Sequence, residues 1–264
     1  MLFKSSVRRL KNSCASAQPT FKLTRPIMGV EPPLDASSLF LIKGSSAGIK
    51  EHRDRQCRPA RAGLGNCPGD PAYCWEAAEG FPPEVAEALQ RTDEAALADL
   101  TPVLATPEFK VPLPGGVRPS QNDLFVLARG AKGPVSIMVE GKVSESFGPT
   151  LGEWRGDASH GKESRLRFLQ RTLGLMENPA GSIRYQLLHR AASSVITGEQ
   201  FRAGRNVMLV HSFSEQHVGW SDYQSFAALF GVDAIEGVVH RLGRDSRIPL
   251  FGVWVVGNCS FLGS

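Results

Sequence analysis

The sequence has no apolar run close to the roughly 18 residues that a membrane-spanning helix requires, so we expect no membrane partner. Cysteine is also scarce: there are five in 264 residues, which is an odd number. Cys57, Cys67 and Cys74 follow one another at intervals that match no usual zinc pattern, and no paired histidines come after them. Free thiols in a reducing cytoplasm are the simpler interpretation.

Acidic residues are absent before Glu31, although the same segment carries several lysines and arginines. Residues 1–60 hold 11 Lys/Arg against 4 Asp/Glu, whereas residues 61–264 hold 19 against 22, so the net charge of +4 belongs to the N-terminal part. We expect residues 1–69 to form a basic, poorly ordered extension and residues 70–264 to form the folded domain. A transit peptide, a disordered arm and an upstream extension from a misplaced start codon all fit this composition.

The sequence also lacks a recognisable DNA-reading module, since it has neither a zinc finger nor a defensible helix-turn-helix. Residues 155–205 are nevertheless basic, with 9 Lys/Arg against 4 Asp/Glu. One basic face suits a ligand with a phosphate backbone, although ordinary surface helices also produce such runs.

The first regular element is a predicted helix that has Asp70 as its N-cap and ends at Gly80. A second helix is expected from Pro82-Pro83 to about Gln90, with a further helical turn or two at 93–100. The pattern then changes to that of strands, separated by Pro114-Gly115-Gly116 and by a hairpin turn at 130–134. The remaining expected elements are strands at 108–113, 123–129, 135–143, 206–213 and 248–256, and helices at 162–174, 182–201 and from the N-cap Ser221 to Phe230. This order predicts an α/β fold with a mixed central sheet flanked by helices.

Three charged residues converge in this prediction. Glu140 and Lys142 are two residues apart on one strand and therefore share a face, with Gly141 pointing away. Pairing through the 130–134 hairpin places Asp123 opposite about Gly141, beside both of them. An E-x-K triplet is common at solvated strand edges, but this one lies in an otherwise apolar strand between Val139 and Val143, where charges need a reason.

Two neighbouring carboxylates repel each other unless a cation or a proton neutralises them. Hard oxygen ligands such as Asp123 and Glu140 suit Mg²⁺ or Mn²⁺, which also bind substrate phosphates. A neighbouring ammonium group, Lys142, can orient or deprotonate an attacking water or stabilise a charged transition state. The trio therefore predicts a divalent-metal site for phosphodiester chemistry.

This arrangement of Asp123 and Glu140-Gly141-Lys142 around a hairpin resembles the signature of the PD-(D/E)XK superfamily, the restriction-endonuclease-like fold. The element order is similar to its αβββαβ core. The segments WEAAEGFPPEV (75–85), VPLPGG (111–116), ESFGPTLGEW (145–154) and RYQLLHR (184–190) also look like an uncharacterised bacterial family assigned to that superfamily. The resemblance covers about residues 70–235. Asn122 departs from it, because it stands where the superfamily name has proline.

The resemblance implies further roles. An acidic residue on the first core helix often lies near the metal, and Glu76 fills that position here. A glutamine on the helix after the E-x-K strand often approaches the site, and Gln186 matches it, with His189 or Arg190 one turn on. Arg184 and Arg190 are candidates for phosphate contacts, though lone arginines are commonly ordinary surface charges.

We leave Glu145 out of the site because it lies past the end of its strand, and we interpret His211 and Ser212 as satisfied core polar groups. The function expected from the resemblance is a Mg²⁺- or Mn²⁺-dependent nuclease acting on DNA, with a homodimer as one arrangement. A non-catalytic binding or scaffold protein on the nuclease fold and a small-molecule phosphoesterase are the alternatives. Intact Asp123, Glu140 and Lys142 favour the enzyme, since a scaffold has no need to hold like charges together.

Overall fold

The structure is a computed structural model that describes residues 74–76, 78–243 and 249–257. The expected extension at 1–69, the N-cap Asp70 and the start of the strand at 248 lie outside these residues. In chain order the elements are α3 (Pro83–Gln90), β1 (Thr101–Val111), β2 (Ser120–Gly130), β3 (Gly133–Lys142), α4 (Leu151–Arg155), α5 (His160–Leu173), α6 (Tyr185–Gln200), β4 (Arg205–Ser212), α7 (Trp220–Ala228), β5 (His240–Leu242) and β6 (Leu250–Val256).

The strands form one six-stranded sheet in the order β1-β2-β3-β4-β6-β5. Strands β1, β2 and β3 pair antiparallel as a meander, β3, β4 and β6 pair parallel, and β5 pairs antiparallel with β6. The mixed sheet flanked by helices confirms the predicted α/β class. Its parallel centre is buried on both sides, which explains the nearly continuous apolar sequence of β4.

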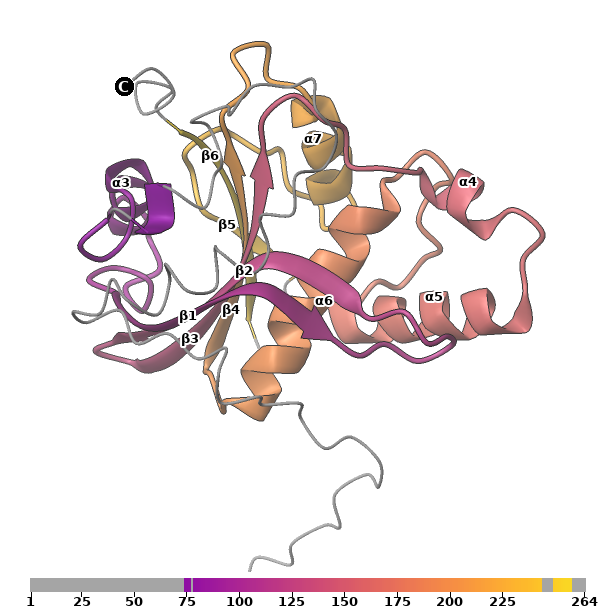
Figure 1. The fold of residues 1–264 in the computed structure, drawn as a ribbon, viewed down its shortest axis with the longest axis horizontal. Coiled ribbons are helices and arrows are strands. Elements are labelled where there is room, and N and C mark those ends of the chain that lie inside the picture. Colours follow the sequence, from indigo (N-terminus) through magenta and orange to yellow (C-terminus); the bar gives the residue numbers. More distant parts are fainter. Residues whose placement is uncertain (1–73, 77, 244–248, 258–264) are drawn as a thin grey trace, which may run out of the picture. The chain divides into compact units, whose positions relative to one another are not determined.

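Helices cover both sides of the sheet, with α3 on one side and α5, α6 and α7 on the other (Figure 1). The side packed against α6, here called the α6 face, includes Met208 and Val210 of β4. The opposite side, the α3 face, includes Val207 and Leu209 of the same strand together with residues of α3. Side chains alternate between these faces along each strand, so a strand position fixes the face on which a polar group lies.

The β2–β3 register differs from the predicted one by a single residue. The strands run up to the pair Gly130 and Gly133, so the hairpin turn is two residues long rather than the whole 130–134 segment. The last ladder pair is Leu124 with Val139, and one further step sets Asp123 opposite Glu140 instead of Gly141. Because opposite residues share a face, this register puts Asp123 on the same face as Glu140, the α6 face.

The predictions around β1 were wrong. Residues 93–100, expected as helix, form turns, and the strand starts at Thr101 rather than at 108. Pro102 and Pro107 lie inside this strand, and the strand was missed because proline is unusual within strands. They are tolerated because β1 is at the edge of the sheet, where a missing backbone donor costs no ladder partner.

Three smaller differences concern helix ends and short elements. The N-cap of α7 is Gly219 rather than Ser221, and the helix ends at Ala228. Two short elements were not predicted. They are helix α4, whose N-terminus has a capping box between Thr150 and Glu153, and the three-residue strand β5. Both elements are too short to show a hydrophobic period.

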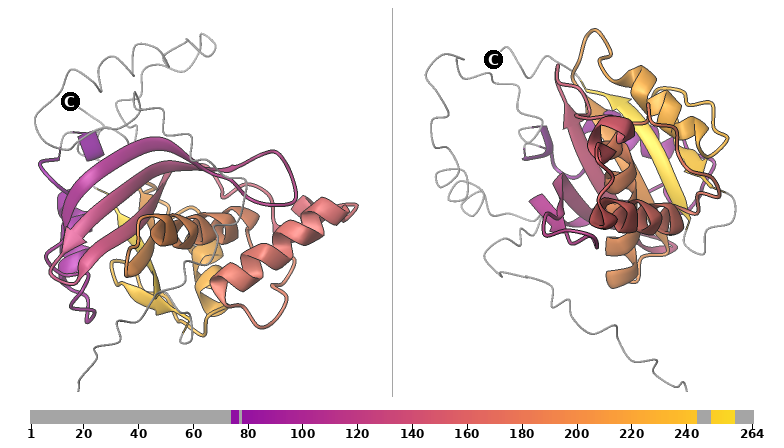
Figure 2. Two further views of the ribbon diagram at one scale, coloured as in Figure 1. Left: turned by 90° about the horizontal axis from the view of Figure 1, so that it is seen from below. Right: turned by 90° about the vertical axis from the view of Figure 1, so that its right-hand side faces the viewer.

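Helix α6 is the longest helix in the described part of the chain, with 16 residues. The predicted apolar positions Leu187, Ala191 and Val195 are all buried against the α6 face. Within residues 74–257, apart from the two undescribed gaps, no helix has the length and apolarity needed to cross a bilayer. Figure 2 shows α6 and α5 on the same side of the sheet.

Candidate functional site

The predicted trio meets at the carboxyl end of β3, on the α6 face. The Glu140 and Lys142 side chains are buried, with 2% and 4% exposed, whereas 45% of the Asp123 side chain is exposed. A carboxylate buried this deeply needs several polar partners, since an unpaired one carries a large desolvation cost. The trio is therefore open to solvent on the Asp123 side only.

Glu140 receives donors from both β3 and α6. Its Oε1 atom accepts from Lys142 Nζ at 2.8 Å and from Gln186 Nε2 at 2.6 Å. Gln186 Oε1 also accepts from Lys142 Nζ at 3.4 Å, so the amide fixes both charged groups. The predicted approach of Gln186 to the site is present in this geometry.

Asp123 lies beside this network rather than inside it. Its Oδ2 atom accepts a hydrogen bond from the Gly141 backbone N–H at 2.8 Å. Burial, followed by the nearby Glu140 charge, raises the pKa of Asp123 to about 6, against lowering contributions from Arg190, Gly141 and Lys142. This raised pKa is the expected result of holding two carboxylates close together.

Arg190 bridges the two carboxylates, which sequence reasoning did not foresee. Its Nε donates to Glu140 Oε2, and its Nη2 is 3.9 Å from Asp123 Oδ1. Arg190 is only 7% exposed, and its expected phosphate contact stays a prediction. With Lys142, it balances the two carboxylate charges.

A second polar layer supports Arg190. Arg190 Nη1 donates to Ser120 Oγ at 3.5 Å, and Ser120 Oγ is 2.7 Å from His189 Nδ1. Burial, with the Arg190 and Arg165 charges as smaller causes, holds the pKa of His189 well below its usual range. His189 is therefore a neutral partner of Ser120.

Glu145, which we excluded, does approach the site. Its Oε1 is 3.8 Å from Lys142 Nζ, and its Oε2 accepts from the backbone N–H groups of Val143 and Ser144. The chain turns back directly after β3, which is why a residue past the strand end returns to Lys142. Glu145 remains 56% exposed and is thus a partner of Lys142 at the solvent-facing rim of the site.

Two other predicted residues are not brought to the trio. Glu76 is exposed, and its neighbour Trp75 packs on the α3 face, against Phe81 and His211. Arg184 forms an ion pair with Asp222 at 2.9 Å and donates to a loop carbonyl at 2.8 Å. Arg184 therefore connects α6 to α7, and neither residue is among the described contacts of Glu140.

The donor set of the trio fits a divalent cation in type. Asp123 and Glu140 supply hard carboxylate oxygens, and the partly exposed Asp123 gives an ion access from solvent. The contact of Arg190 Nε with Glu140 Oε2 is the obstacle, because the guanidinium holds a positive charge against the carboxylate that an ion would bind. Metal binding and the Arg190 contact therefore compete for the Glu140 carboxylate.

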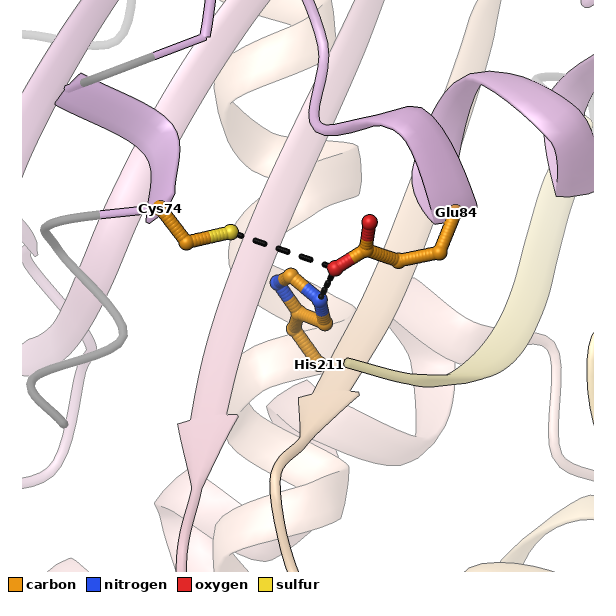
Figure 3. A group of neighbouring side chains, drawn as sticks. All are labelled: Cys74, Glu84 and His211. Atoms are coloured by element: carbon orange, nitrogen blue, oxygen red, sulfur yellow. Dashed lines mark hydrogen bonds and ion pairs between the residues drawn. The ribbon is translucent and has the colours of Figure 1, made fainter. Parts of the chain in front are cut away.

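A second polar cluster lies on the α3 face and contains Cys74, Glu84 and His211 (Figure 3). Glu84 Oε1 is 3.0 Å from His211 Nε2 and 3.9 Å from Cys74 Sγ. All three residue types bind metals, and their ligand atoms lie within 4.8 Å of one another. Side-chain alternation along β4 separates this cluster from the trio by the thickness of the sheet.

Hydrogen bonding argues against a metal ion in this cluster. The Trp75 indole N–H, which can only donate, points to His211 Nδ1 at 3.1 Å, so Nδ1 carries no proton. The single ring proton is then on Nε2 and is donated to Glu84. A metal ion on Nε2 would force either an imidazolate or the loss of the Trp75 bond. Burial and Glu84 also raise the pKa of the Cys74 thiol to about 12, which keeps it protonated.

We predict that His211→Ala lowers the free energy of unfolding by about 1–3 kcal/mol, because the buried Trp75 N–H loses its acceptor. Equimolar Zn²⁺ leaves the melting temperature of the wild type unchanged. Urea unfolding and thermal melts measure the two effects. His217→Ala is the matched control, since this exposed histidine pairs with Glu236 at the surface, where such contacts contribute less than about 1 kcal/mol. A zinc-dependent rise in melting temperature that disappears in His211→Ala would show that the ring does bind metal.

Comparison with known proteins gives a family but no activity. No curated protein and no solved structure matches this chain. One family model, described as a domain of unknown function (DUF6946), matches residues 70–259, which cover the sheet, all the described helices and both polar clusters. The chain therefore belongs to the DUF6946 family.

Proposed function

We propose that this protein is a divalent-metal-dependent nuclease of the PD-(D/E)XK type that hydrolyses phosphodiester bonds in DNA. The observation that carries the proposal is the meeting of Asp123, Glu140 and Lys142 on one face at the end of β3. Like charges are rarely held this close in an apolar sheet without a chemical use. A cytoplasmic location belongs to the proposal, because Cys74 is a free thiol.

Each side chain has a role in this proposal. Asp123 and Glu140 hold the Mg²⁺ or Mn²⁺ ion, which when bound supplies charge stabilisation at a phosphoryl oxygen and a more acidic water. Lys142 carries its ammonium group 2.8 Å from Glu140, where it orients the attacking water or stabilises the negative charge of the transition state. Gln186 positions both Glu140 and Lys142, since its amide contacts each of them.

A second candidate is a binding or scaffold protein that retains the fold without turnover. One observation favours it: both Glu140 oxygens are already paired, with Arg190 on one and Lys142 and Gln186 on the other. Two cations balance two carboxylates, so the site is electrically satisfied without a metal. The two candidates differ in whether a divalent ion displaces Arg190 from Glu140.

The test is a cleavage assay on plasmid, linear duplex and single-stranded DNA, each with Mg²⁺, with Mn²⁺ and with EDTA. We expect cleavage of at least one substrate that requires the metal and stops in EDTA. Bis(p-nitrophenyl) phosphate in the same assay detects a small-molecule phosphoesterase. Hydrolysis of that compound with every nucleic acid left intact would replace the nuclease proposal. No hydrolysis of any substrate, with either metal, would favour the scaffold.

A further inference from the structure

A basic pocket lies next to the N-terminal end of α6, outside the trio. It has a volume of about 350 Å³ and is lined by the connection between β1 and β2 and by residues of α4 and α5. The side chains that matter here, which define the basic pocket, are Arg118, Trp154, Lys162 and Arg165. Figure 2 shows the long β1–β2 connection reaching toward α5.

The wall of the basic pocket is held in place without a ligand. Arg165, which is 8% exposed, donates from Nε to the carbonyl of Pro114 at 2.8 Å and from Nη2 to those of Leu113 and Gly116 at 3.2 and 3.1 Å. Gly115 has a φ of +80°, and a Cβ there would lie 2.1 Å from the backbone oxygen of Gly161. The loop backbone therefore packs directly on the start of α5, which makes the pocket a preformed feature.

The positive charge of the basic pocket is not neutralised by the protein. In the part of the chain that the structure describes, none of Arg118, Lys162 and Arg165 forms an ion pair with a carboxylate. Among the described residues, the partner of Lys162 Nζ is the backbone carbonyl of Arg155, at 3.0 Å. The neighbouring Glu163 pairs with Arg155 at 2.6 Å instead. Three converging cations without counter-charges favour an anionic ligand.

A chain of contacts connects the basic pocket to the trio. Trp154 stacks on Tyr185, the first residue of α6, with ring centroids 4.0 Å apart. The Tyr185 ring lies 4.8 Å from His189, whose partner Ser120 also contacts Arg190. Tyr185 and Arg190 are five residues apart on α6, a rise of about 7–8 Å at 1.5 Å per residue, so the contacts run along the first turns of this helix.

We propose that the basic pocket binds a phosphate group of a single-stranded nucleic acid whose neighbouring phosphodiester lies at the trio. This inference rests on the proposed function, because it assigns part of the substrate to a second place on the same side of the molecule. Arg118 and Lys162 attract the phosphate, and Arg165 holds the loop that presents it. Trp154, which is only partly buried, offers a base next to that phosphate the ring face that is not stacked on Tyr185, as in proteins that bind single strands.

The test measures binding rather than cleavage. Fluorescence anisotropy of a labelled single-stranded 20-mer is recorded with the full chain in a Lys142→Met background, with and without Arg118→Ala/Lys162→Ala. We expect the double variant to raise the Kd about tenfold or more and to reduce the slope of log K against log salt by about 1–2. The control Arg129→Ala/Lys132→Ala removes two exposed charges around the β2–β3 turn and should change Kd less than about twofold.

The outcomes separate this inference from the nuclease proposal. If wild type cleaves DNA but the double variant binds with unchanged Kd and salt slope, the pocket proposal is wrong and the nuclease proposal stands. If nothing is cleaved but binding still depends on Arg118 and Lys162, the reverse holds. The pocket proposal is overturned if no form of the protein binds the 20-mer, or if the control variant loses as much affinity as the double variant. It is also overturned if inorganic phosphate alone binds as tightly as the 20-mer, or if the protein clearly prefers duplex DNA. If the double variant is unstable, the same binding measurement is made with Arg118→Ala alone, because Arg118 lies in an exposed loop.

Discussion

Asp123→Asn and Lys142→Met each lower metal-dependent DNA cleavage by at least about a hundredfold, which is the expected cost of losing a charged group that acts at the transition state. Asparagine retains the acceptor for the Gly141 N–H but removes the negative charge that holds the ion. Methionine replaces the Lys142 side chain as far as its Cε but removes the ammonium group that contacts Glu140. The measurement is the initial rate of plasmid or oligonucleotide cleavage at saturating Mg²⁺.

The two variants differ in their expected stability, and the difference controls for misfolding. The Asp123 side chain is 45% exposed, and its burial together with the Glu140 charge already disfavours its ionised form, so Asp123→Asn should fold at least as well as the wild type near neutral pH. Asp233→Asn, at an exposed position, is the charge-matched control and should cleave at the wild-type rate. A folded Asp123→Asn protein that cleaves normally would remove Asp123 from the chemistry and, with it, the proposed metal site.

The convergence of the trio was predictable because it is a local property of a hairpin. Two residues on one strand and one on its neighbour are positioned by strand alternation and a short turn, without reference to the rest of the fold. The prediction erred by one residue in register, since a two-residue turn cannot be distinguished from a longer one around Gly130. That single step decides which face Asp123 occupies, and here it brings Asp123 to the side of Glu140.

The partners of Glu140 on α6 were only partly predictable. Helical spacing puts Gln186 and Arg190 on the same side of α6, but it does not say how far the helix sits from the sheet. That distance depends on the packing of apolar residues from α4, α5, α6 and α7 against the α6 face. Arg190 was expected as a candidate phosphate contact, and its burial against Glu140 was not predicted.

Sequence reasoning could predict even less of the cluster formed by Cys74, Glu84 and His211. Its members are up to 137 positions apart in the sequence and come from a helical turn, a short helix and the central strand β4. The interpretation of His211 as a satisfied core group agrees with its bonds to Trp75 and Glu84, but its partners followed only from tertiary packing. The sheet thus carries two polar clusters on opposite faces at the same end of β3 and β4.

Arg190→Met separates the nuclease from the scaffold most directly, because Arg190 occupies the place that a metal ion needs. In EDTA we expect the variant to lose about 3–5 kcal/mol of unfolding free energy, since the buried Glu140 loses a charged partner and faces Asp123 without it. In the presence of Mn²⁺ the two carboxylates gain a new cation. Mn²⁺ at a concentration of about a hundred times its Kd should restore about 2.7 kcal/mol of the unfolding free energy that Arg190→Met has lost. Urea unfolding at pH 8, above the Asp123 pKa of about 6, measures both values with that carboxylate ionised.

Arg184→Met is the matched control, because it removes an arginine from the start of the same helix. Arg184 pairs with Asp222 at a partly exposed position, so Arg184→Met should lose less unfolding free energy than Arg190→Met, and the loss should not depend on Mn²⁺. For wild type we expect a smaller stabilisation by Mn²⁺ than for Arg190→Met, since the ion must first displace the guanidinium from Glu140. If Mn²⁺ stabilises neither protein, the carboxylates do not form a metal site. The Glu140 network is then a structural ion-pair cluster, and the scaffold becomes the better account of this fold.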